Sequence, residues 1–275
     1  MIKIGVLGAG GRMGQAIIAE VQAAADTWLA GGVERAQHPL VGREIGEGQV
    51  VGANAAPLAR KADVLIDFST PDALDEHLRA AEEARTAILV GTTGLLPAHH
   101  ARLDRAAQQI PVLQAANTSL GVTLLAALVE QAARALDAKW DIEIAELHHR
   151  HKVDAPSGTA LYLGEAAARG RGAPLESLRL PAHCGHSGVR RAGGIGFASL
   201  RGGSAAGEHK VIFATEGERL EFAHVAEGRE LFAHGAVTAA RWLAGQKPGR
   251  YQMADMLGLQ AQASLVRQAG NLTGP

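Results

Sequence analysis

Cysteine is nearly absent from this chain, which has a single one, Cys184, among 275 residues. One cysteine forms no intrachain disulfide, so the sequence favours a reducing compartment and a fold held together by its apolar core. His183 and His186 flank this cysteine, so a His-Cys-x-His metal cluster has to be considered. A closed site of that kind draws on several cysteine or histidine ligands. Because the chain has no second cysteine, we expect an ordinary loop or core cysteine and no bound metal.

Aromatic residues, net charge and long apolar runs are also scarce. Aromatics make up 4% of the chain and the formal net charge is −1. Nucleic acids are bound through basic grooves and stacked aromatic side chains, so we expect no nucleic-acid partner. No uncharged apolar run reaches the roughly 18 residues of a membrane span, and the N-terminal MIKIGVLGAG lacks the pattern of a secretory signal. These absences predict a soluble, cytoplasmic protein without a membrane partner.

The chain up to Asn117 alternates continuous apolar runs with helical patterns. This alternation is typical of a parallel sheet with helices on both faces, a doubly wound α/β fold of the Rossmann type. We expect strands at Ile2–Leu7, Trp28–Val33, Ala62–Phe68, Thr86–Gly91 and Ile110–Ala116, and helices at Gly14–Ala25, Asp72–Ala84 and between the last two strands. Pro71 suits the first turn of the helix that follows it.

After Asn117 the pattern predicts a second, α+β domain with a mixed or antiparallel sheet. In Trp140–His149 the apolar and polar residues alternate, which places Ile142, Ile144, Glu146 and His148 on one face of a strand. An apolar helix is expected before it, further strands after it, and a last, alanine-rich helix that could return to the first domain. These segments are Gly121–Leu136, Gly193–Leu200, Glu208–Thr215, Glu218–Ala226 and Glu230–Gly245. The predicted domains are 1–119 with 229–275, and 120–228, with a hinge near 118–121 and 227–230.

A glycine-rich loop, GVLGAGGRMG, joins the first strand to the first helix. Gly8, Gly11 and Gly14 give a G-x-x-G-x-x-G spacing, one residue longer at the end than the dinucleotide fingerprint. Glycines allow the tight turn and a close approach of pyrophosphate to the helix N-terminus. Glu34 follows Gly14 by 20 residues, where a carboxylate can bind ribose hydroxyls, and Arg35 beside it suits a 2′-phosphate. The alternative is a tight strand–helix turn with no ligand.

Two more loops follow predicted strands at their carboxyl ends, the edge where ligands bind in open parallel sheets. They are GTTG at Gly91–Gly94 and AANTS at Ala115–Ser119. Both are small and polar, so a nicotinamide ring could lie against them; the alternative is that both are structural turns.

The segment HHRHKVDAPSGTAL, His148–Leu161, concentrates histidines next to a lysine. A metal site is disfavoured because His148 and His149 point to opposite faces of a strand and Lys152 adds positive charge. A plain surface loop is a second alternative. Imidazole titrates near neutrality and can transfer a proton, so we favour a proton-transfer site.

The rest of that segment predicts an anion site at the start of a helix. Ser157 is a candidate N-cap, and the amides of Gly158 and Thr159 would point out of the first turn toward a carboxylate. Together with Lys152 and His149 as sources of positive charge, this indicates hydride transfer to an acidic small molecule.

The motifs GAGGRMG, GTTG, AANTS, HHRHKVDAPSGTAL and GEHKVIFATEGERLEFAH occur in this order. Together they resemble the 4-hydroxy-tetrahydrodipicolinate reductases of the diaminopimelate–lysine pathway, from Ile2 to about Leu243. The resemblance implies reduction of a small cyclic dicarboxylate by NADPH or NADH with loss of water, and a homotetramer.

The resemblance also implies roles for individual residues. It assigns proton transfer to His148 and Lys152, and substrate binding to His149, Gly158 and Thr159. It assigns cofactor binding to Gly8, Ala9, Gly10, Gly11, Arg12, Met13, Glu34, Arg35, Gly91, Thr92, Thr93, Ala115, Ala116, Asn117 and Thr118. The family commonly has an aromatic residue where Thr118 stands, which leaves the role of this threonine open.

Two rival functions remain at this stage. One is another two-domain NAD(P)-dependent dehydrogenase of a small amino or keto acid. The other is a non-catalytic redox sensor that binds the dinucleotide and has no need of His148 or Lys152. Glu34 and Arg35 favour different cofactors, so the preference between NADH and NADPH also stays open.

Overall fold

The computed structural model describes residues 1–259 and divides into two compact units. One unit is Met1–Leu120 together with the chain from Arg229 on, and the other is Gly121–Gly228. The two crossings between the units fall in the segments expected to form a hinge. Residues 260–275, which the sequence assigns to the first domain, lie outside the described residues.

The first unit contains an eight-stranded sheet in the order β12-β7-β6-β5-β1-β2-β4-β3. All neighbouring strands are parallel except the pair β3–β4. The strands are β1 (Ile2–Leu7), β2 (Thr27–Val33), β3 (Glu44–Gly46), β4 (Gln49–Gly52), β5 (Val64–Asp67), β6 (Ala87–Val90), β7 (Pro111–Gln114) and β12 (Gly249–Tyr251). The predicted parallel sheet is therefore confirmed. β5 and β6 lie near its centre and are buried, which explains why residues 64–66 and Ala87–Val90 are entirely apolar.

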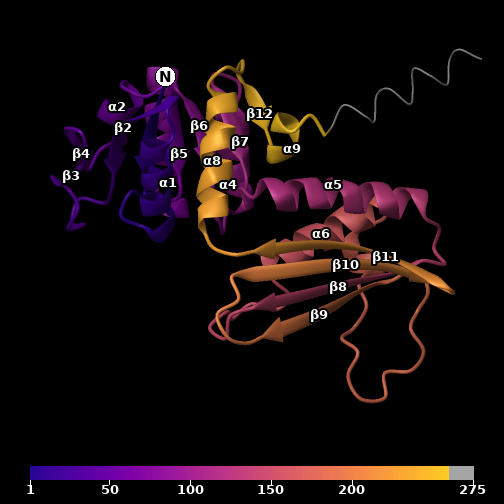
Figure 1. The fold of residues 1–275 in the computed structure, drawn as a ribbon. Coiled ribbons are helices and arrows are strands. Elements are labelled where there is room, and N and C mark those ends of the chain that lie inside the picture. Colours follow the sequence, from indigo (N-terminus) through magenta and orange to yellow (C-terminus); the bar gives the residue numbers. More distant parts are fainter. Residues whose placement is uncertain (260–275) are drawn as a thin grey trace, which may run out of the picture. The chain divides into compact units, whose positions relative to one another are not determined.

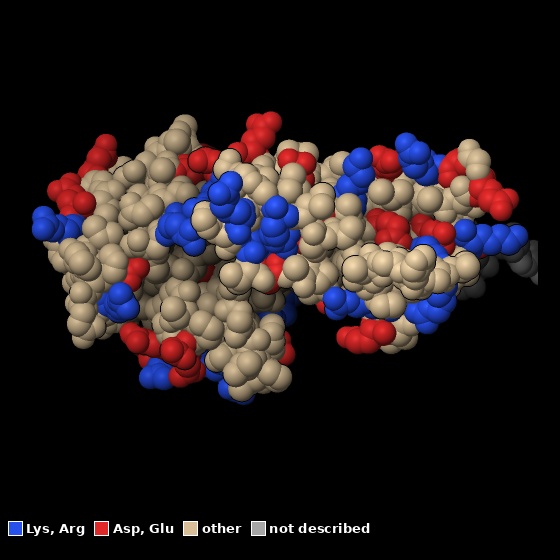
Figure 2. All heavy atoms as spheres, turned by 90° about the horizontal axis from the view of Figure 1, so that it is seen from below, with Lys and Arg blue, Asp and Glu red and all other residues tan. Residues whose placement is uncertain are grey.

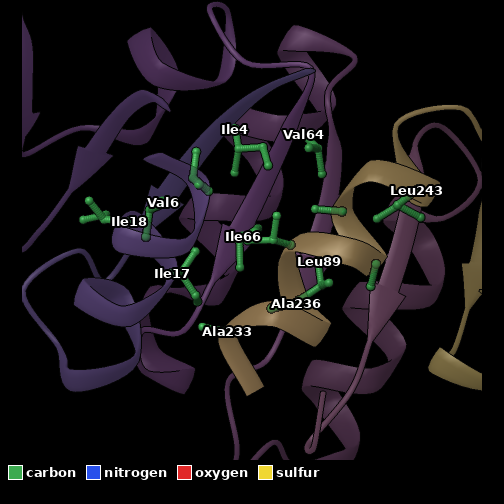
Figure 3. Packing of buried hydrophobic residues seen from close by; sticks show 14 of the residues in the cluster. Ile4, Val6, Ile17, Ile18, Val64, Ile66, Leu89, Ala233, Ala236 and Leu243 are labelled. Carbon is green, nitrogen blue, oxygen red and sulfur yellow. The ribbon is translucent and has the colours of Figure 1, made fainter. Parts of the chain in front are cut away.

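Helices cover both faces of this sheet (Figure 1). On one face, α1 (Arg12–Ala23) and α8 (Glu230–Leu243) pack side by side over the core shown in Figure 3. On the other face lie α2 (Ala55–Ala59), α3 (Leu74–Ala84) after the short 3-10 turn η1 (Pro71–Ala73), and α4 (Pro97–Ala106). The buried Ala233, Ala236 and Ala240 of α8 confirm that the alanine-rich last helix returns to the first unit. The short α9 (Met253–Met256) follows β12.

The second unit has a four-stranded mixed sheet in the order β11-β10-β8-β9. Its elements are α5 (Leu120–Ala135), β8 (Asp141–His148), α6 (Gly158–Gly170), α7 (Leu175–Leu178), β9 (Ile195–Arg201), β10 (Gly207–Thr215) and β11 (Glu218–Ala226). β8 is antiparallel to β10 and parallel to β9. The face of β8 predicted from the alternation is the buried one. Glu146 and His148 are buried on the same face as Ile142 and Ile144, which pack against residues of α5 and α6.

The structure differs from the sequence prediction mainly at element ends and in short elements. The first helix begins at Arg12, two residues earlier than expected, because Gly11 serves as its N-cap. β9 begins at Ile195 because Gly193 has a φ of 73°, which is incompatible with an extended strand. The short β3, β4, α2 and β12 were not predicted, because three to five residues carry too little periodicity to be recognised.

Within residues 1–259 no helix is long and apolar enough to cross a membrane. Figure 2 shows Lys and Arg side chains together with Asp and Glu side chains on the face it displays, in keeping with a net charge of −1.

Candidate active site

The glycine loop closes tightly between β1 and α1. Gly8 has a φ of 79°, a conformation that favours glycine. A Cβ on Gly14 would lie 2.1 Å from the carbonyl oxygen of Gly8, so only glycine fits there without a shift of backbone. Gly11 is the N-cap of α1 and offers no side chain to its first turn. The amides at this helix N-terminus are therefore oriented as in a phosphate site.

One pocket lies between this loop and the ends of β2 and β5. It is lined by Gly8, Gly10, Gly11, Val33, Glu34, Arg35, His38, Ala53, Phe68, Ser69, Thr70, Ala73, Glu76 and His77. Glu34 accepts hydrogen bonds from the amides of Gly10 (2.8 Å) and Arg35 (3.2 Å). The ring of His38 lies where a Cβ on Gly10 would be, at 2.3 Å. Sequence reasoning missed His38, since nothing in the motif marks a residue four positions after the acidic one.

A second pocket lies on the other side of the glycine loop. It is lined by Gly11, Arg12, Met13, Phe68, Ser69, Gly91, Thr92, Thr93, Ala116, Asn117, Thr118 and Phe232. A Cβ on Gly91 would lie 2.3 Å from the Phe68 ring, so glycine there lets that ring lie close to the loop. The Thr118 hydroxyl donates to the carbonyl of Phe232 at 2.7 Å, which gives this threonine a structural role. Phe68 and Phe232 are aromatic lining residues that the motifs did not reveal.

The structure brings most of the expected cofactor residues to these two pockets. The exceptions are Ala9 and Ala115, whose side chains are buried in the core cluster of the first unit. Both pockets lie at the carboxyl ends of the parallel strands. They are next to β1, which lies between β2 and β5 in the sheet. An uncapped helix N-terminus between two pockets fits a dinucleotide, with the pyrophosphate over α1.

A buried carboxylate holds the loops after β5 and β6 in place. Asp67 is fully buried and accepts hydrogen bonds from the Ser69 amide (2.9 Å), the Ser69 hydroxyl (2.6 Å) and the Thr92 hydroxyl (3.2 Å). Its other oxygen lies 2.9 Å from Nδ1 of His77. Because buried polar groups with complete hydrogen bonding are rigid, Asp67 links the walls of both pockets.

In the second unit, His148 ends β8 beside a buried carboxylate. Its Nδ1 lies 2.5 Å from Oε2 of Glu146, which is 2% exposed. Arg201 on β9 donates to both oxygens of Glu146, each at 2.8 Å, and the Ser157 amide donates to Oε1 at 3.2 Å. Burial raises the pKa of Glu146, but hydrogen bonds from Arg201, Ser199 and His148 outweigh this and lower it from 4.5 to about 2. Glu146 is therefore ionised at neutral pH.

His209 on β10 lies directly behind His148. The two rings are 5.0 Å apart and perpendicular, and Nε2 of His209 is 3.0 Å from the Ser157 hydroxyl. Burial, and secondarily the proximity of His148, lowers the pKa of His209 from 6.5 to about 4. His209 is therefore neutral at pH 7. Sequence reasoning overlooked Glu146, Arg201 and His209 as functional residues, although the alternation of β8 had already put Glu146 and His148 on one face.

The rest of the histidine-rich segment forms a turn that leads into α6. Ser157 is the N-cap of α6, as predicted, and its hydroxyl accepts from the Ala160 amide at 3.1 Å. A Cβ on Gly158 would meet no atom of the described chain within 4 Å, so the helix start is open to an incoming group. Lys152 donates to both oxygens of Asp154, at 2.7 and 2.8 Å. This ion pair lowers the pKa of Asp154 and was not anticipated from the sequence.

Metal ligation has little support from the side-chain arrangement. In the part of the chain that the structure describes, no three His, Cys, Asp or Glu side chains are grouped to hold a metal ion. Cys184 is exposed. His183 lies 3.1 Å from the hydroxyl of Ser187.

Comparison with known proteins agrees with this two-part architecture. The family model described as dihydrodipicolinate reductase, N-terminus, matches residues 2–118, and the model for the C-terminus of the same enzyme matches residues 121–257. The chain belongs to the dihydrodipicolinate reductase family.

Curated relatives of this family cover nearly the whole chain. The 4-hydroxy-tetrahydrodipicolinate reductase of Zymomonas mobilis is 54% identical over 94% of this chain and 98% of its own length. The reductase of Parvibaculum lavamentivorans is 51% identical with the same coverage. A solved dihydrodipicolinate reductase from Paenisporosarcina, with dipicolinate bound, superposes with a TM-score of 0.74 at 25% identity, over 92% of this chain and 97% of that one.

Proposed function

We propose that this chain reduces 4-hydroxy-tetrahydrodipicolinate to tetrahydrodipicolinate with NADPH or NADH, the reductive step of the diaminopimelate route to lysine. The observation that carries this proposal is the 54% identity over 94% of the chain to a reductase of that name. In the reaction the 4-hydroxyl group leaves as water. A hydride and a proton are then added to neighbouring ring positions.

The first unit, taken as the dinucleotide-binding domain, would hold the cofactor in its two pockets. The reduced dinucleotide supplies the hydride when it is bound. The amides of the α1 N-terminus bind its pyrophosphate, and Glu34 and Arg35 contact its adenosine ribose. Phe68, Thr92 and Asn117 line the pocket that remains for the nicotinamide ring.

The second unit, taken as the substrate domain, would hold the dicarboxylate and deliver the proton. The amides of Gly158 and Thr159 at the open start of α6 bind one carboxylate. His149 and Lys152 add positive charge, and His148 supplies the proton to the ring carbon. The dicarboxylate in the related Paenisporosarcina structure fits a substrate of this class.

Steady-state turnover tests the proposal. Freshly generated substrate is added to the purified protein with each reduced nicotinamide cofactor, and oxidation of the cofactor is followed by absorbance. We expect turnover with this substrate, and we expect the double variant His148→Ala/Lys152→Ala to lose it while keeping NADPH affinity within a few-fold. Activity only with a different amino or keto acid would support the rival dehydrogenase. Undiminished turnover in the double variant would refute the assigned roles.

A homotetramer and a cytoplasmic location complete the proposal. The long edge strand β11 of the second unit has nine residues, and its first four, residues 218–221, are exposed, so it offers a surface on which copies of the chain can pair. Light scattering on the purified protein gives its mass in solution, and a monomer at micromolar concentration would contradict the tetramer.

A further inference from the structure

Glu146 is a buried acidic residue to which the proposed reaction assigns no role. Four nitrogen atoms surround its two oxygens, and the Ser199 side chain is a further hydrogen-bond partner. Oε1 accepts from the Ser157 amide and from one guanidinium nitrogen of Arg201. Oε2 accepts from the other guanidinium nitrogen and faces Nδ1 of His148 at 2.5 Å. A carboxylate that is buried and saturated in this way is fixed in position.

This arrangement determines which nitrogen of His148 carries the proton of the neutral ring. Glu146 is an ionised acceptor and cannot donate a hydrogen bond. An unprotonated Nδ1 would place two lone pairs against each other at 2.5 Å, so the proton must be on Nδ1. Nε2 is then the nitrogen that exchanges a proton with another molecule. A Cβ on Gly207 would lie 3.0 Å from Nε2, so the glycine keeps that side of the ring clear of a side chain.

The other charged and titratable groups around His148 do not compete for this role. Arg201 on β9 is the direct strand partner of His148 and is engaged by Glu146 and by the carbonyl of Asp154. Lys152, on the turn after β8, is paired with the Asp154 carboxylate. His209 on β10 is neutral at pH 7, and the proximity of His224 on β11 contributes to lowering the pKa of His209.

We propose that Glu146, held by Arg201, is a positioning residue that keeps the ring proton of His148 on Nδ1 and leaves Nε2 to exchange a proton with the substrate. The effect on turnover rests on the proposed function. The tautomer itself does not, so the two are tested separately.

Glu146→Gln is the decisive variant because an amide cannot accept at both ends. With its NH₂ at the Oε1 position, it would oppose both the Ser157 amide and Arg201. With its NH₂ at the Oε2 position, it opposes Arg201 alone and can donate to Nδ1 of His148. The second orientation has fewer conflicts, and it moves the ring proton to Nε2. The matched control is Glu143→Gln on the same strand, which removes a carboxylate paired to Arg190 at 2.7 Å on the opposite face.

The tautomer is read from nitrogen NMR of histidine-labelled protein above neutral pH, with His148→Asn to assign the signal. We expect the Nδ1–H form in the wild type and in Glu143→Gln, and the Nε2–H form in Glu146→Gln. Steady-state kinetics should show kcat lowered by about tenfold or more in Glu146→Gln, with KM and NADPH affinity within about threefold. Glu143→Gln should keep the wild-type kcat.

Two results would overturn the inference. One is an Nε2–H ring in the wild-type protein, which needs no variant and holds even if Glu146→Gln fails to fold. The other is a folded Glu146→Gln with the wild-type kcat. A wild-type protein that shows the Nδ1–H form but does not reduce the substrate would instead refute the proposed function and, with it, the catalytic consequence.

Discussion

Acidification should destabilise this protein through His209, starting near pH 6.5, above the pH at which ordinary carboxylates begin to titrate. His209 is 5% exposed, and its pKa is lowered from 6.5 to about 4 by burial and by the nearby His148. The unfolded chain therefore binds a proton at His209 more readily than the native chain. The neutral His209 ring makes its full contribution to the free energy of unfolding above pH 6.5, and this contribution is lost as the pH falls toward 4. The loss is about 2 kcal/mol at pH 5 and about 3 kcal/mol in total.

Urea unfolding across this pH range measures the effect. Trp140 is partly buried against the core of the second unit, so a version with Trp28→Phe and Trp242→Phe reports unfolding of that unit by fluorescence. In this background, His209→Gln removes the titrating ring. The free energy of unfolding should then fall by about 2 kcal/mol less between pH 7 and pH 5 than it does in the parent protein. His183→Gln removes an exposed histidine and should leave the decline unchanged.

The reasoning fails if His209→Gln and the parent lose the same stability between pH 7 and pH 5. Such a result would mean that His209 is protonated in the native protein at pH 5. In that case the negative charge of Glu146, which is linked to His209 by hydrogen bonds through Ser157, would raise the pKa of His209 by more than burial and His148 lower it.

Four further predictions concern the other features of the structure. Gly14→Ala places a Cβ 2.1 Å from the carbonyl oxygen of Gly8. It should weaken NADPH binding, measured by calorimetry, by about tenfold or more, and lower the free energy of unfolding, measured by thermal unfolding, by about 1–3 kcal/mol. The control is Gly202→Ala, whose Cβ meets no described atom within 4 Å. Arg35→Ala should raise the KM for NADPH more than that for NADH, and Glu34→Gln the reverse; equal effects on both cofactors would contradict the assignment of the ribose site. The pKa of Glu146 is lowered from 4.5 to about 2, so its ionised form should contribute about 3 kcal/mol of stability above pH 4.5 that is lost as the pH falls toward 2. In urea unfolding, the free energy of unfolding of Glu146→Gln should therefore decrease less between pH 4.5 and pH 2 than that of Glu143→Gln. Binding of both ligands should change the small-angle scattering profile if the segments 118–121 and 227–230 act as a hinge, and superimposable profiles would exclude closure.

The sequence predicts the first unit well because its signals are local. Continuous apolar strands such as Ala87–Val90 indicate burial on both faces of a sheet. Glycines at which a side chain would meet backbone, such as Gly14, mark the phosphate loop. Pro71 and Ser157 mark helix starts by capping rules that act within three or four residues. The lining residues His38 and Phe232 lie beyond the reach of such rules, since their places depend on how separate segments pack.

The second unit shows where local reasoning ends. The alternation along β8 correctly predicts that Glu146 and His148 share a face, but their environment depends on residues more than 50 positions away. Arg201 and His209 reach them only because β9 and β10 pair with β8 on either side. The spacing of residues along the chain does not reveal that pairing. The alternation in β8 therefore could not show that the Glu146 carboxylate is buried and ionised.

β8 ends in two buried polar residues, Glu146 and His148, and their interaction explains why both are polar. Burying Glu146 costs several kcal/mol unless its charge is compensated. Arg201 provides that compensation with one N–H group to each carboxylate oxygen, and the Ser157 amide adds a further hydrogen bond. Replacing the pair by apolar residues would be nearly neutral for stability by the same reasoning, so stability alone does not account for a carboxylate at this position. Its orientation toward Nδ1 of His148 does account for it, because a protonated ring nitrogen on that side leaves Nε2 to act as the proton-exchanging atom.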